Sequence, residues 1–309
     1  MKTASDNLVK MYVVKFPCPT RGFFGVYLEA IRCIDYAVSN ELPFYVDLSE
    51  SNSLYTDAGR FNGNTNVWDY YYEQPKPLSA SVVYSVSKYE GNIDKIWKRS
   101  HFQRVYERAV RRLKYTNELE EILGKRKRDF PSSVIGVHIR KTDHGTEVPA
   151  IAFASYIELL TKKIAQENYR HIFLATDDIT VLQGIEELFP GIKVITNNVT
   201  RSGDGTPVHK NENLANKYEL GVEAILDAYT LSLCDETILT NSNLSYCSLY
   251  MNPVMKYSLL DGFETGKLKM YFRNLFYETR YAMYHNPVFI QWHRRWRYFV
   301  KRIQNTGNA

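Results

Sequence analysis

The sequence predicts an α/β protein whose strands form parallel sheets, and three observations support this fold class. Short apolar runs of strand length alternate with stretches of helical periodicity between residues 134 and 245, as expected of successive β-α-β units. A shorter strand–helix–strand pattern precedes them at residues 11–48. Polar residues gather where the predicted strands end, which is where open α/β sheets bind ligands. We therefore expect two α/β halves and a helical C-terminal segment.

Length and composition indicate a folded protein of one large domain or two ordinary ones. The 309 residues are 44% hydrophobic and 24% charged, with a net charge of +5, which is typical of a soluble globular protein. No run of about 18 apolar residues could span a membrane, and the N-terminus lacks the apolar core of a secretory signal peptide. The four cysteines show no C-x-x-C spacing, so no zinc site is indicated. We expect a reduced, cytoplasmic protein.

Residues 11–48 predict the first β-α-β unit. A strand at 11–16 ends at Pro17, because proline removes a backbone donor from a sheet. Apolar residues recur at helical spacing over 26–37, and a second apolar run follows at 42–48. The next segment, 49–75, is rich in Ser, Asn, Gly and Tyr, and its length suggests a functional loop. Tyrosines at this density suit a sugar-binding surface or a Tyr-rich core, and both interpretations remain open.

Gly22, Phe23, Phe24 and Gly25 stand at the turn between the first strand and its helix. Glycines there let a ligand approach the backbone, and a helix N-terminus favours negative charge. The turn lacks the G-x-G-x-x-G and G-K-[ST] patterns of phosphate-binding loops. An ordinary tight turn is therefore the alternative.

A basic stretch separates the two halves. Eleven lysines and arginines lie between Lys98 and Arg128, in one or two helices predicted over 93–128, and such a patch suits a phosphate-bearing partner or forms a solvated helix face. We place the domain boundaries at 1–130, 131–262 and 263–309. The last segment interleaves aromatic and basic residues, which suits either a helix on an anionic membrane surface or one that packs back onto the first domain.

Residues 134–245 predict four strands, each followed by a helix. The strands are expected at 134–139, 171–175, 193–196 and 236–240. The helices are expected at 153–168, 179–189 and 219–233, with a fourth opening at 241–245. Polar clusters follow the strands at 138–147, 176–178, 197–213 and 240–245. Because the carboxyl ends of parallel strands meet at one edge of a sheet, these clusters should converge.

Several charged residues in these clusters suit particular chemistry. Arg140 ends a core strand, where its charge needs an anion, and its planar fork suits a diphosphate. Glu147 follows in the loop and is a natural general base for a hydroxyl group. Asp227 lies inside an apolar helical run and needs a donor partner, such as the N–H edge of a purine. Asp177 and Asp178 could pair with Arg140, bind a metal or cap the next helix, and capping is favoured.

No motif for covalent or metal catalysis accompanies these residues. The sequence contains neither a G-x-S-x-G nucleophile nor an H-E-x-x-H metal site. An arginine for an anion and a carboxylate for a proton, between two α/β halves, fit a group transferase. Its leaving group would be a nucleoside diphosphate.

Three motifs resemble those of the α-1,6-fucosyltransferases. Residues 138–147, H-I-R-K-T-D-H-G-T-E, are similar to the family's H-x-R-x-T-D…G-T-E motif, and Leu174–Asp178 resembles its second motif. Residues 225–242 resemble the third. The resemblance covers about residues 134–250 and is loose over 11–47, and in layout the chain is similar to the short bacterial nodulation fucosyltransferases. Two departures are a turn shortened by one residue around His144, where the family usually has lysine, and Ser242-Asn243 in place of a serine pair.

The resemblance implies a GT-B fold, in which two Rossmann-like domains face each other across a cleft. It also implies GDP-fucose as the donor substrate, inversion at the anomeric carbon and no metal or other cofactor. Glu147 would activate the acceptor hydroxyl, and Arg140 would stabilise the departing GDP. The positions that would bind the donor are His138, Arg140, Asp177, Asp178, Asp227, Thr240 and Ser242. Among them, Asp227 would recognise guanine.

The acceptor side is assigned more broadly. The resemblance places acceptors on the first domain, so Gly22, Phe23, Phe24 and Gly25 are candidate contacts, together with His144 in the loop. We expect a glycan or lipid-linked oligosaccharide as acceptor, no nucleic acid partner, and peripheral membrane contact through residues 263–309. The alternatives are the same fold with a different nucleotide sugar, or a non-catalytic nucleotide- or glycan-binding protein.

Overall fold

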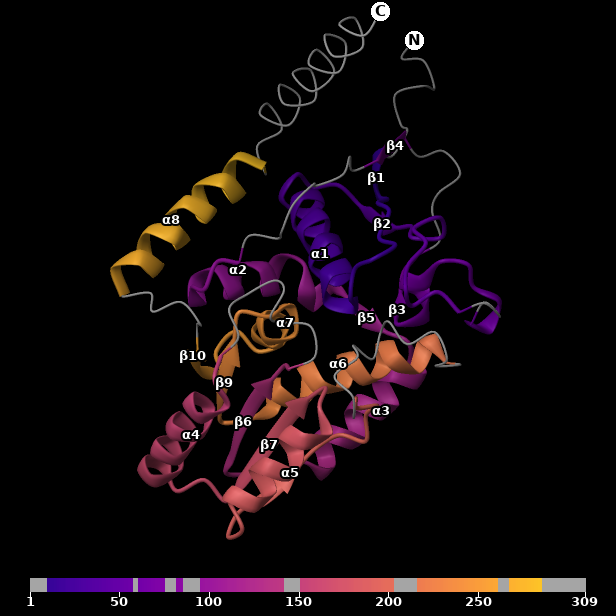
Figure 1. The fold of residues 1–309 in the computed structure, drawn as a ribbon. Helices are drawn as coiled ribbons and strands as arrows, with labels where there is room; N and C mark the ends of the chain where they lie inside the picture. The colour runs from indigo at the N-terminus through magenta and orange to yellow at the C-terminus, as the bar shows by residue number, and fades with distance from the viewer. Residues whose placement is uncertain are drawn as a thin grey trace, which may run out of the picture.

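The computed structural model describes residues 10–57, 61–75, 82–85, 95–141, 151–202, 216–260 and 267–284. Within these ranges the strands form a five-stranded parallel sheet, a three-stranded parallel sheet and a short antiparallel pair (Figure 1). Helices cover both faces of the larger sheet. The predicted α/β class with parallel sheets is confirmed.

The larger sheet has the strand order β10-β9-β6-β7-β8, and every neighbouring pair is parallel. Its strands are β6 (Val134–Ile139), β7 (His171–Thr176), β8 (Lys193–Ile195), β9 (Glu236–Thr240) and β10 (Lys256–Leu260). The helices that follow them are α4 (Phe153–Glu167), α5 (Ile179–Leu188), α6 (Lys217–Leu233) and α7 (Asn243–Met251). The predicted elements are confirmed to within two residues at each end. β10 was not predicted, because an edge strand with no fully buried residue carries no continuous apolar run.

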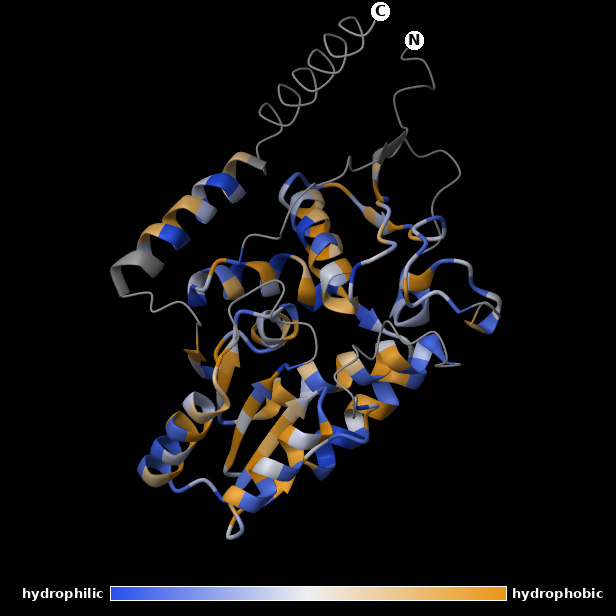
Figure 2. Cartoon of the chain, viewed as in Figure 1, coloured by the Kyte–Doolittle hydropathy of each residue, from blue (hydrophilic) through white to orange (hydrophobic). Residues whose placement is uncertain are grey.

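β6 lies at the centre of this sheet, and all six of its residues are buried. The neighbouring strand β7 is also mostly hydrophobic (Figure 2), and five of its six residues are buried. Gly136 has no room for a side chain, since an added Cβ would lie 2.8 Å from Thr237 Cγ2 and 2.9 Å from Cys234 Sγ. Glycine therefore lets β9 and the end of α6 close onto β6. This packing holds the polar residues that follow the strand in place.

The smaller sheet has the order β2-β1-β4. Its strands are β1 (Lys10–Val14), β2 (Phe44–Val46) and β4 (Val82–Ser85), and α1 (Phe23–Ser39) connects the first two. β1 and β2 pair in parallel, which confirms the first predicted β-α-β unit. β4 lies apart from any predicted element.

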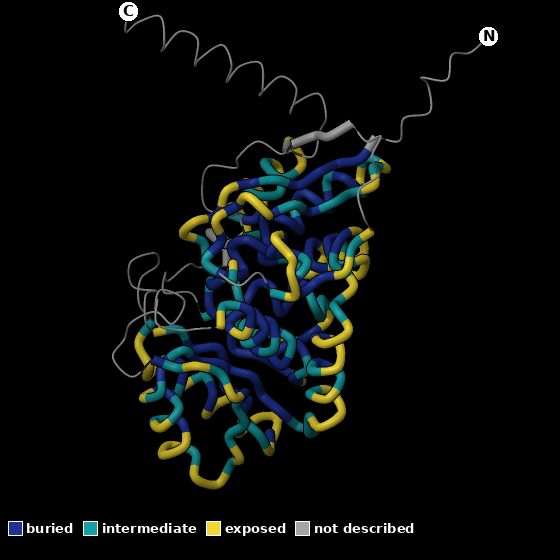
Figure 3. The backbone as a smooth tube through the Cα atoms, turned by 90° about the vertical axis from the view of Figure 1, so that its right-hand side faces the viewer, coloured by how far each residue is buried: buried dark blue, intermediate teal, exposed yellow. Residues whose placement is uncertain are grey.

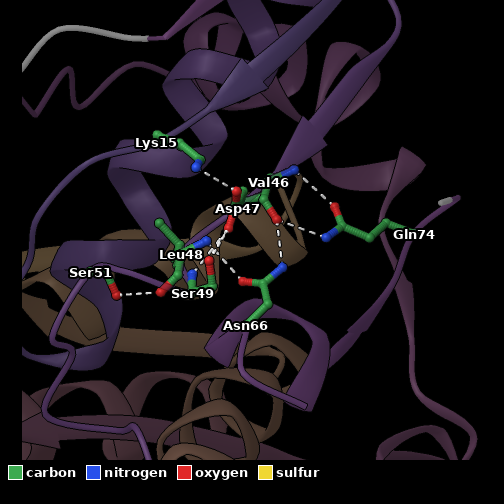
Figure 4. Close-up of polar contacts among 8 residues, drawn as sticks. All are labelled: Lys15, Val46, Asp47, Leu48, Ser49, Ser51, Asn66 and Gln74. Carbon is green, nitrogen blue, oxygen red and sulfur yellow. Dashed lines mark hydrogen bonds and ion pairs between the residues drawn. The ribbon is translucent and has the colours of Figure 1, made fainter. Parts of the chain in front are cut away.

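Side chains complete the outer edge of β2 in place of another strand. Gln74 accepts a hydrogen bond from the Val46 N–H at 2.9 Å and donates to the Val46 carbonyl at 2.7 Å (Figure 4). Asn66 donates to the same carbonyl at 2.8 Å and accepts from the Leu48 N–H at 2.8 Å. These amides satisfy backbone groups that an edge strand otherwise leaves open. They also hold the irregular segment that follows β2 against the sheet.

The aromatic rings of that segment belong to the core. Four of them are at most 5% exposed. They are Trp68, Tyr70, Tyr71 and Tyr72. For these residues the Tyr-rich core is confirmed and the sugar-binding surface is wrong. Tyr71 lies on Gly221 of α6, where an added Cβ would be 2.0 Å from the Tyr71 hydroxyl oxygen. That hydroxyl donates to the Tyr218 carbonyl at 3.2 Å.

One hydrophobic cluster runs from the smaller sheet to the larger one. It joins α1, α2 (Arg99–Arg108) and α3 (Asn117–Asp129) with α6 and α7. A second cluster lies on the opposite face of the larger sheet, beneath α4 and α5. The buried backbone is continuous between the two sheets (Figure 3). The division into domains at residues 130 and 262 stays a prediction.

α8 (Lys267–Tyr284) packs along the start of α2. Asn274 accepts from the Trp97 N–H at 3.1 Å and donates to its carbonyl at 3.3 Å, and Lys98 pairs with Glu278. α8 also exposes large apolar side chains to solvent. They are Tyr271, Phe272, Leu275, Phe276 and Met283. No helix among the described residues is long and apolar enough to cross a membrane, and residues 285–309 lie outside the described ranges.

Candidate functional site

A cavity of about 260 Å³ lies where the N-terminus of α1 faces the carboxyl ends of β6 and β7. The segment after β8, one face of α6 and the N-terminus of α7 complete its walls. Its lining residues are Thr20, Gly22, Phe23, Phe24, Gly25, Tyr55, His138, Arg140, Thr176, Asp177, Val199, Thr200, Leu220, Glu223, Ala224, Asp227, Asn243 and Leu244. The predicted convergence of the strand ends is confirmed.

The cavity brings together most of the residues that the sequence singled out. His138, Arg140, Asp177 and Asp227 line it, and so do all four residues of the turn from Gly22 to Gly25. The turn, expected on an acceptor side, thus shares one cavity with the expected donor residues. Three further donor candidates do not line it. They are Asp178, Thr240 and Ser242.

The predicted base and its loop lie outside the described residues. Glu147 and His144 belong to the range 142–150. The last described residue before that range is Lys141, whose N–H donates to Asp177 at 3.1 Å. Lys141 is therefore held beside a residue that lines the cavity. The role of Glu147 stays a prediction.

His138 lines the cavity from the end of β6 and is only 4% exposed. Its Nδ1 lies 2.7 Å from the Ser245 hydroxyl and 3.1 Å from the Ser242 hydroxyl, both at the start of α7. Ser242 also caps α7, because its hydroxyl accepts from the Ser245 N–H at 3.1 Å. A buried imidazole held by two hydroxyls has a defined orientation. Thr240, at the end of β9, is fully buried.

Arg140 follows β6 and reaches the cavity with a side chain that is 27% exposed. Its Nε lies 4.0 Å from a carboxylate oxygen of Asp177, which follows the neighbouring strand β7. A guanidinium carries five N–H donors in a planar arrangement that suits an anion. The positive end of α7, whose first residues also line the cavity, adds to the attraction for negative charge.

Asp178 faces away from the cavity and caps α5. Its Oδ1 accepts from the Thr180 N–H at 2.7 Å and from the Val181 N–H at 3.3 Å, so the predicted capping is confirmed. Burial alone would raise the pKa of Asp178, but the hydrogen bonds from Thr180 and Val181 and the charge of Lys141 outweigh it and lower that pKa. The neighbouring carboxylates thus have different places, Asp177 at the cavity and Asp178 at the helix.

Asp227 lines the cavity from α6 and is 8% exposed. One of its oxygens accepts a hydrogen bond from Asn197 Nδ2 at 2.7 Å. Burial raises the pKa of Asp227 to about 7, against the hydrogen bond from Asn197 and the nearby charge of Arg201, which lower it. The predicted need for a donor partner is met by Asn197. The carboxylate still faces the cavity with capacity to accept further hydrogen bonds.

Sequence reasoning missed several cavity residues. Glu223 lies four residues before Asp227 and so occupies the same face of α6; this spacing was the one usable signal. Its carboxylate accepts from the Thr200 N–H at 3.0 Å and from the Thr200 hydroxyl at 3.1 Å. Thr200 and Asn197 belong to the cluster 197–213, whose convergence was predicted, but their contacts with Glu223 and Asp227 on α6 were not predicted.

The described residues contain no cluster of three His, Cys, Asp or Glu side chains arranged as metal ligands. The cavity instead offers nitrogen donors from His138 and Arg140 and carboxylates from Asp177, Glu223 and Asp227. Whether the reaction needs a metal stays a prediction.

Comparison with known proteins shows which solved structures have a similar fold. No protein-family model matches the chain. The structure is similar to crystal structures of NodZ α-1,6-fucosyltransferase co-crystallised with GDP (18% identity, 78% of this chain and 92% of that one, TM-score 0.51) and soaked with GDP-fucose (15% identity, 80% and 93%, TM-score 0.50). The selenomethionine form of fucosyltransferase NodZ from Bradyrhizobium is equally similar (18% identity, 78% and 92%, TM-score 0.50). At this identity the likeness concerns the fold, and the chain has a fucosyltransferase-like fold.

Proposed function

We propose that the protein is an inverting glycosyltransferase that transfers fucose from GDP-fucose to a hydroxyl group of a glycan, without a metal. The observation that carries the proposal is the arrangement of charge in one cavity. His138 and Arg140 face it at the ends of the sheet, and Asp227 faces it from α6. A nucleoside diphosphate sugar has matching chemistry, with an anionic centre and a base that donates hydrogen bonds.

The donor would lie along the cavity with its diphosphate at Arg140 and His138. One edge of a guanine base carries two neighbouring donors, the ring N–H and the amino group. A carboxylate can accept hydrogen bonds from both. Asp227 is suited to that role, because its second oxygen is not used by Asn197. The similarity to NodZ structures determined with GDP and with GDP-fucose supports this choice of donor.

The proposed reaction is a single displacement. The acceptor oxygen forms a bond to the anomeric carbon while the bond from that carbon to the diphosphate oxygen breaks. Glu147 takes the proton of the acceptor hydroxyl. Negative charge develops on the departing GDP, so donors placed beforehand at Arg140 and His138 act most strongly in the transition state.

The acceptor is proposed to be a glycan or a lipid-linked oligosaccharide used on the cytoplasmic side of a membrane. The exposed apolar face of α8 leads into residues 285–309, which contain five basic and no acidic residues. Vesicle sedimentation of the protein with and without residues 285–309 tests this part of the proposal. Equal binding of both proteins to vesicles rich in anionic lipid would remove these residues as the attachment.

The donor proposal is tested with a panel of nucleotides and nucleotide sugars. We expect GDP to raise the melting temperature more than UDP, ADP or CMP, and GDP-fucose to release GDP faster than GDP-mannose does. A preference for a uridine or adenine nucleotide would indicate the same fold with another donor. Binding of GDP without turnover of any GDP-sugar, with or without glycan acceptors, would favour a nucleotide-binding protein.

A further inference from the structure

Two buried serines behind His138 have a constrained set of hydrogen bonds. Ser245 is fully buried and Ser242 is 3% exposed. Neither of them lines the cavity. Both hydroxyls approach the same ring atom, Nδ1 of His138, at 2.7 Å from Ser245 and 3.1 Å from Ser242. The tautomer of His138 therefore decides whether these hydroxyls are satisfied.

Each hydroxyl oxygen already accepts a backbone hydrogen bond. The Ser245 N–H donates to Ser242 Oγ at 3.1 Å, and the Thr240 N–H approaches Ser245 Oγ at 3.4 Å. For the hydroxyl hydrogens, His138 Nδ1 is the one acceptor found among the described residues. If Nδ1 carried a proton, both buried hydroxyls would lack an acceptor, and buried polar groups are rarely left so. If Nδ1 instead carries a lone pair, it can accept a hydrogen bond from the closer hydroxyl, that of Ser245.

We propose that Ser245 sets the tautomer of His138, by donating its hydroxyl hydrogen to Nδ1 and so leaving the ring proton on Nε2. Because Nδ1 faces the serines, Nε2 is the ring nitrogen that meets a ligand in the cavity. An N–H there attracts a diphosphate oxygen, whereas a lone pair there would repel it. Ser245 is thus a positioning residue that acts through His138. The inference rests on the proposed function only in naming the ligand as a diphosphate.

The tautomer is measured directly by two-dimensional NMR of protein with ¹⁵N-labelled histidine. The His138 signals are identified by their loss in His138→Gln. We expect the long-range ¹H–¹⁵N pattern of an Nε2–H imidazole in the unmodified protein and a shift toward mixed tautomers in Ser245→Ala. Ser248→Ala is the matched control, since Ser248 is equally buried one turn further along α7 and donates to the Ser245 carbonyl at 2.8 Å.

Two results of that measurement would overturn the proposal. One is an Nδ1–H tautomer in the unmodified protein, and the other is an unchanged tautomer in Ser245→Ala. The spectra require no substrate and no turnover. A failure of the fucosyltransferase proposal would therefore leave this result untouched, and the two failures remain distinguishable.

A double-mutant cycle tests the consequence for GDP-fucose turnover. Ser245→Ala should lower kcat/KM roughly tenfold, the size of one hydrogen bond lost to a reacting group. The same substitution should have almost no further effect in a His138→Gln background, because Ser245 acts through that ring. Ser248→Ala should stay near the unmodified rate. An equal loss in both backgrounds would mean that Ser245 only supports the fold, and the proposal would be wrong.

Discussion

The cavity has two walls of opposite character. The basic wall consists of His138 and Arg140 at the end of β6, and the acidic wall consists of Glu223 and Asp227 on α6. The Arg140 side chain is 27% exposed, and its Nε lies 4.0 Å from a carboxylate oxygen of Asp177. Asp227 is 8% exposed and carries a pKa raised to about 7. Burial therefore leaves the Asp227 carboxyl of the acidic wall only partly ionised near neutrality, and this distinguishes the two walls.

This difference has a functional meaning for a nucleotide. The diphosphate is anionic throughout the neutral range, and in the proposed function it is bound by Arg140. A guanine edge that donates hydrogen bonds prefers the ionised form of Asp227. We therefore expect the affinity for GDP to fall as pH drops below about 7, in step with protonation of Asp227. Substitutions in the two walls should therefore have different effects on turnover and on the pH dependence of stability.

The largest effect on the transfer rate should come from Glu147, which belongs to neither wall. Glu147→Gln removes the proposed base, so transfer to an acceptor should fall about 10²- to 10⁴-fold, while both walls still hold GDP. Transfer rates and GDP affinity are measured side by side. Glu187→Gln removes the same charge from an exposed position of α5 and is the matched control. Transfer that survives Glu147→Gln would assign proton removal to another group.

The acidic wall should be visible in the pH dependence of stability. Because the pKa of Asp227 is about 7 in the folded protein against an ordinary value of 3.8, the folded state binds the extra proton between these values. The protonated Asp227 carboxyl therefore makes its full contribution to the free energy of unfolding below about pH 4. That contribution, up to about 4 kcal/mol, is lost as the pH rises through 7. Asp227→Asn should remove this loss.

The measurement for Asp227 is chemical denaturation at pH 5 and pH 8. The difference in unfolding free energy between these values should be smaller in Asp227→Asn than in the unmodified protein. Asp235→Asn is the control, as a carboxylate just beyond the same helix. An identical pH dependence with and without the Asp227 carboxyl group would show that Asp227 does not carry the raised pKa.

The basic wall is broken by Arg140→Ala. Loss of one fixed donor to a developing negative charge should lower turnover at least about 100-fold. Arg170→Ala, at an exposed site before β7, controls for loss of positive charge. If the turnover of Arg140→Ala stays within a few-fold of the unmodified protein, the assignment of Arg140 to the diphosphate is wrong.

The smallest effect concerns the two aspartates after β7. Asp178→Ala should cost about 1 kcal/mol of stability, the usual value of a helix N-cap, with turnover little changed. Asp177→Ala should change turnover of GDP-fucose more than it changes stability, since Asp177 lines the cavity near Arg140. Melting temperatures and rates of both variants are compared. The reverse pattern would contradict the division of roles between cap and cavity.

The sequence predicted the middle of the larger sheet closely because its strands β6, β7 and β9 are buried on both faces. Such strands form continuous apolar runs, as at Val134–Ile139, and the helices between them have regular periodicity. Arg140 and Asp227 were also predictable, since each is a charge placed inside an apolar context. The cavity's remaining parts depend on chain geometry. Tyr55 reaches it from an irregular segment, Asn197 contacts Asp227 behind it, and edge strand β10 has too little apolar pattern to be recognised.

Tyr71 and Gly221 have a consequence for how the molecule unfolds. The Tyr71 ring occupies the space that glycine leaves on α6, and it stacks on Tyr218 with ring centroids 5.6 Å apart. Separating the smaller sheet, together with the segment that follows β2, from α6 would require withdrawing that ring from a core that is continuous between the sheets. We therefore expect both sheets to unfold together in one cooperative transition in denaturant. The slope of the unfolding free energy against denaturant concentration should then correspond to exposure of the whole chain.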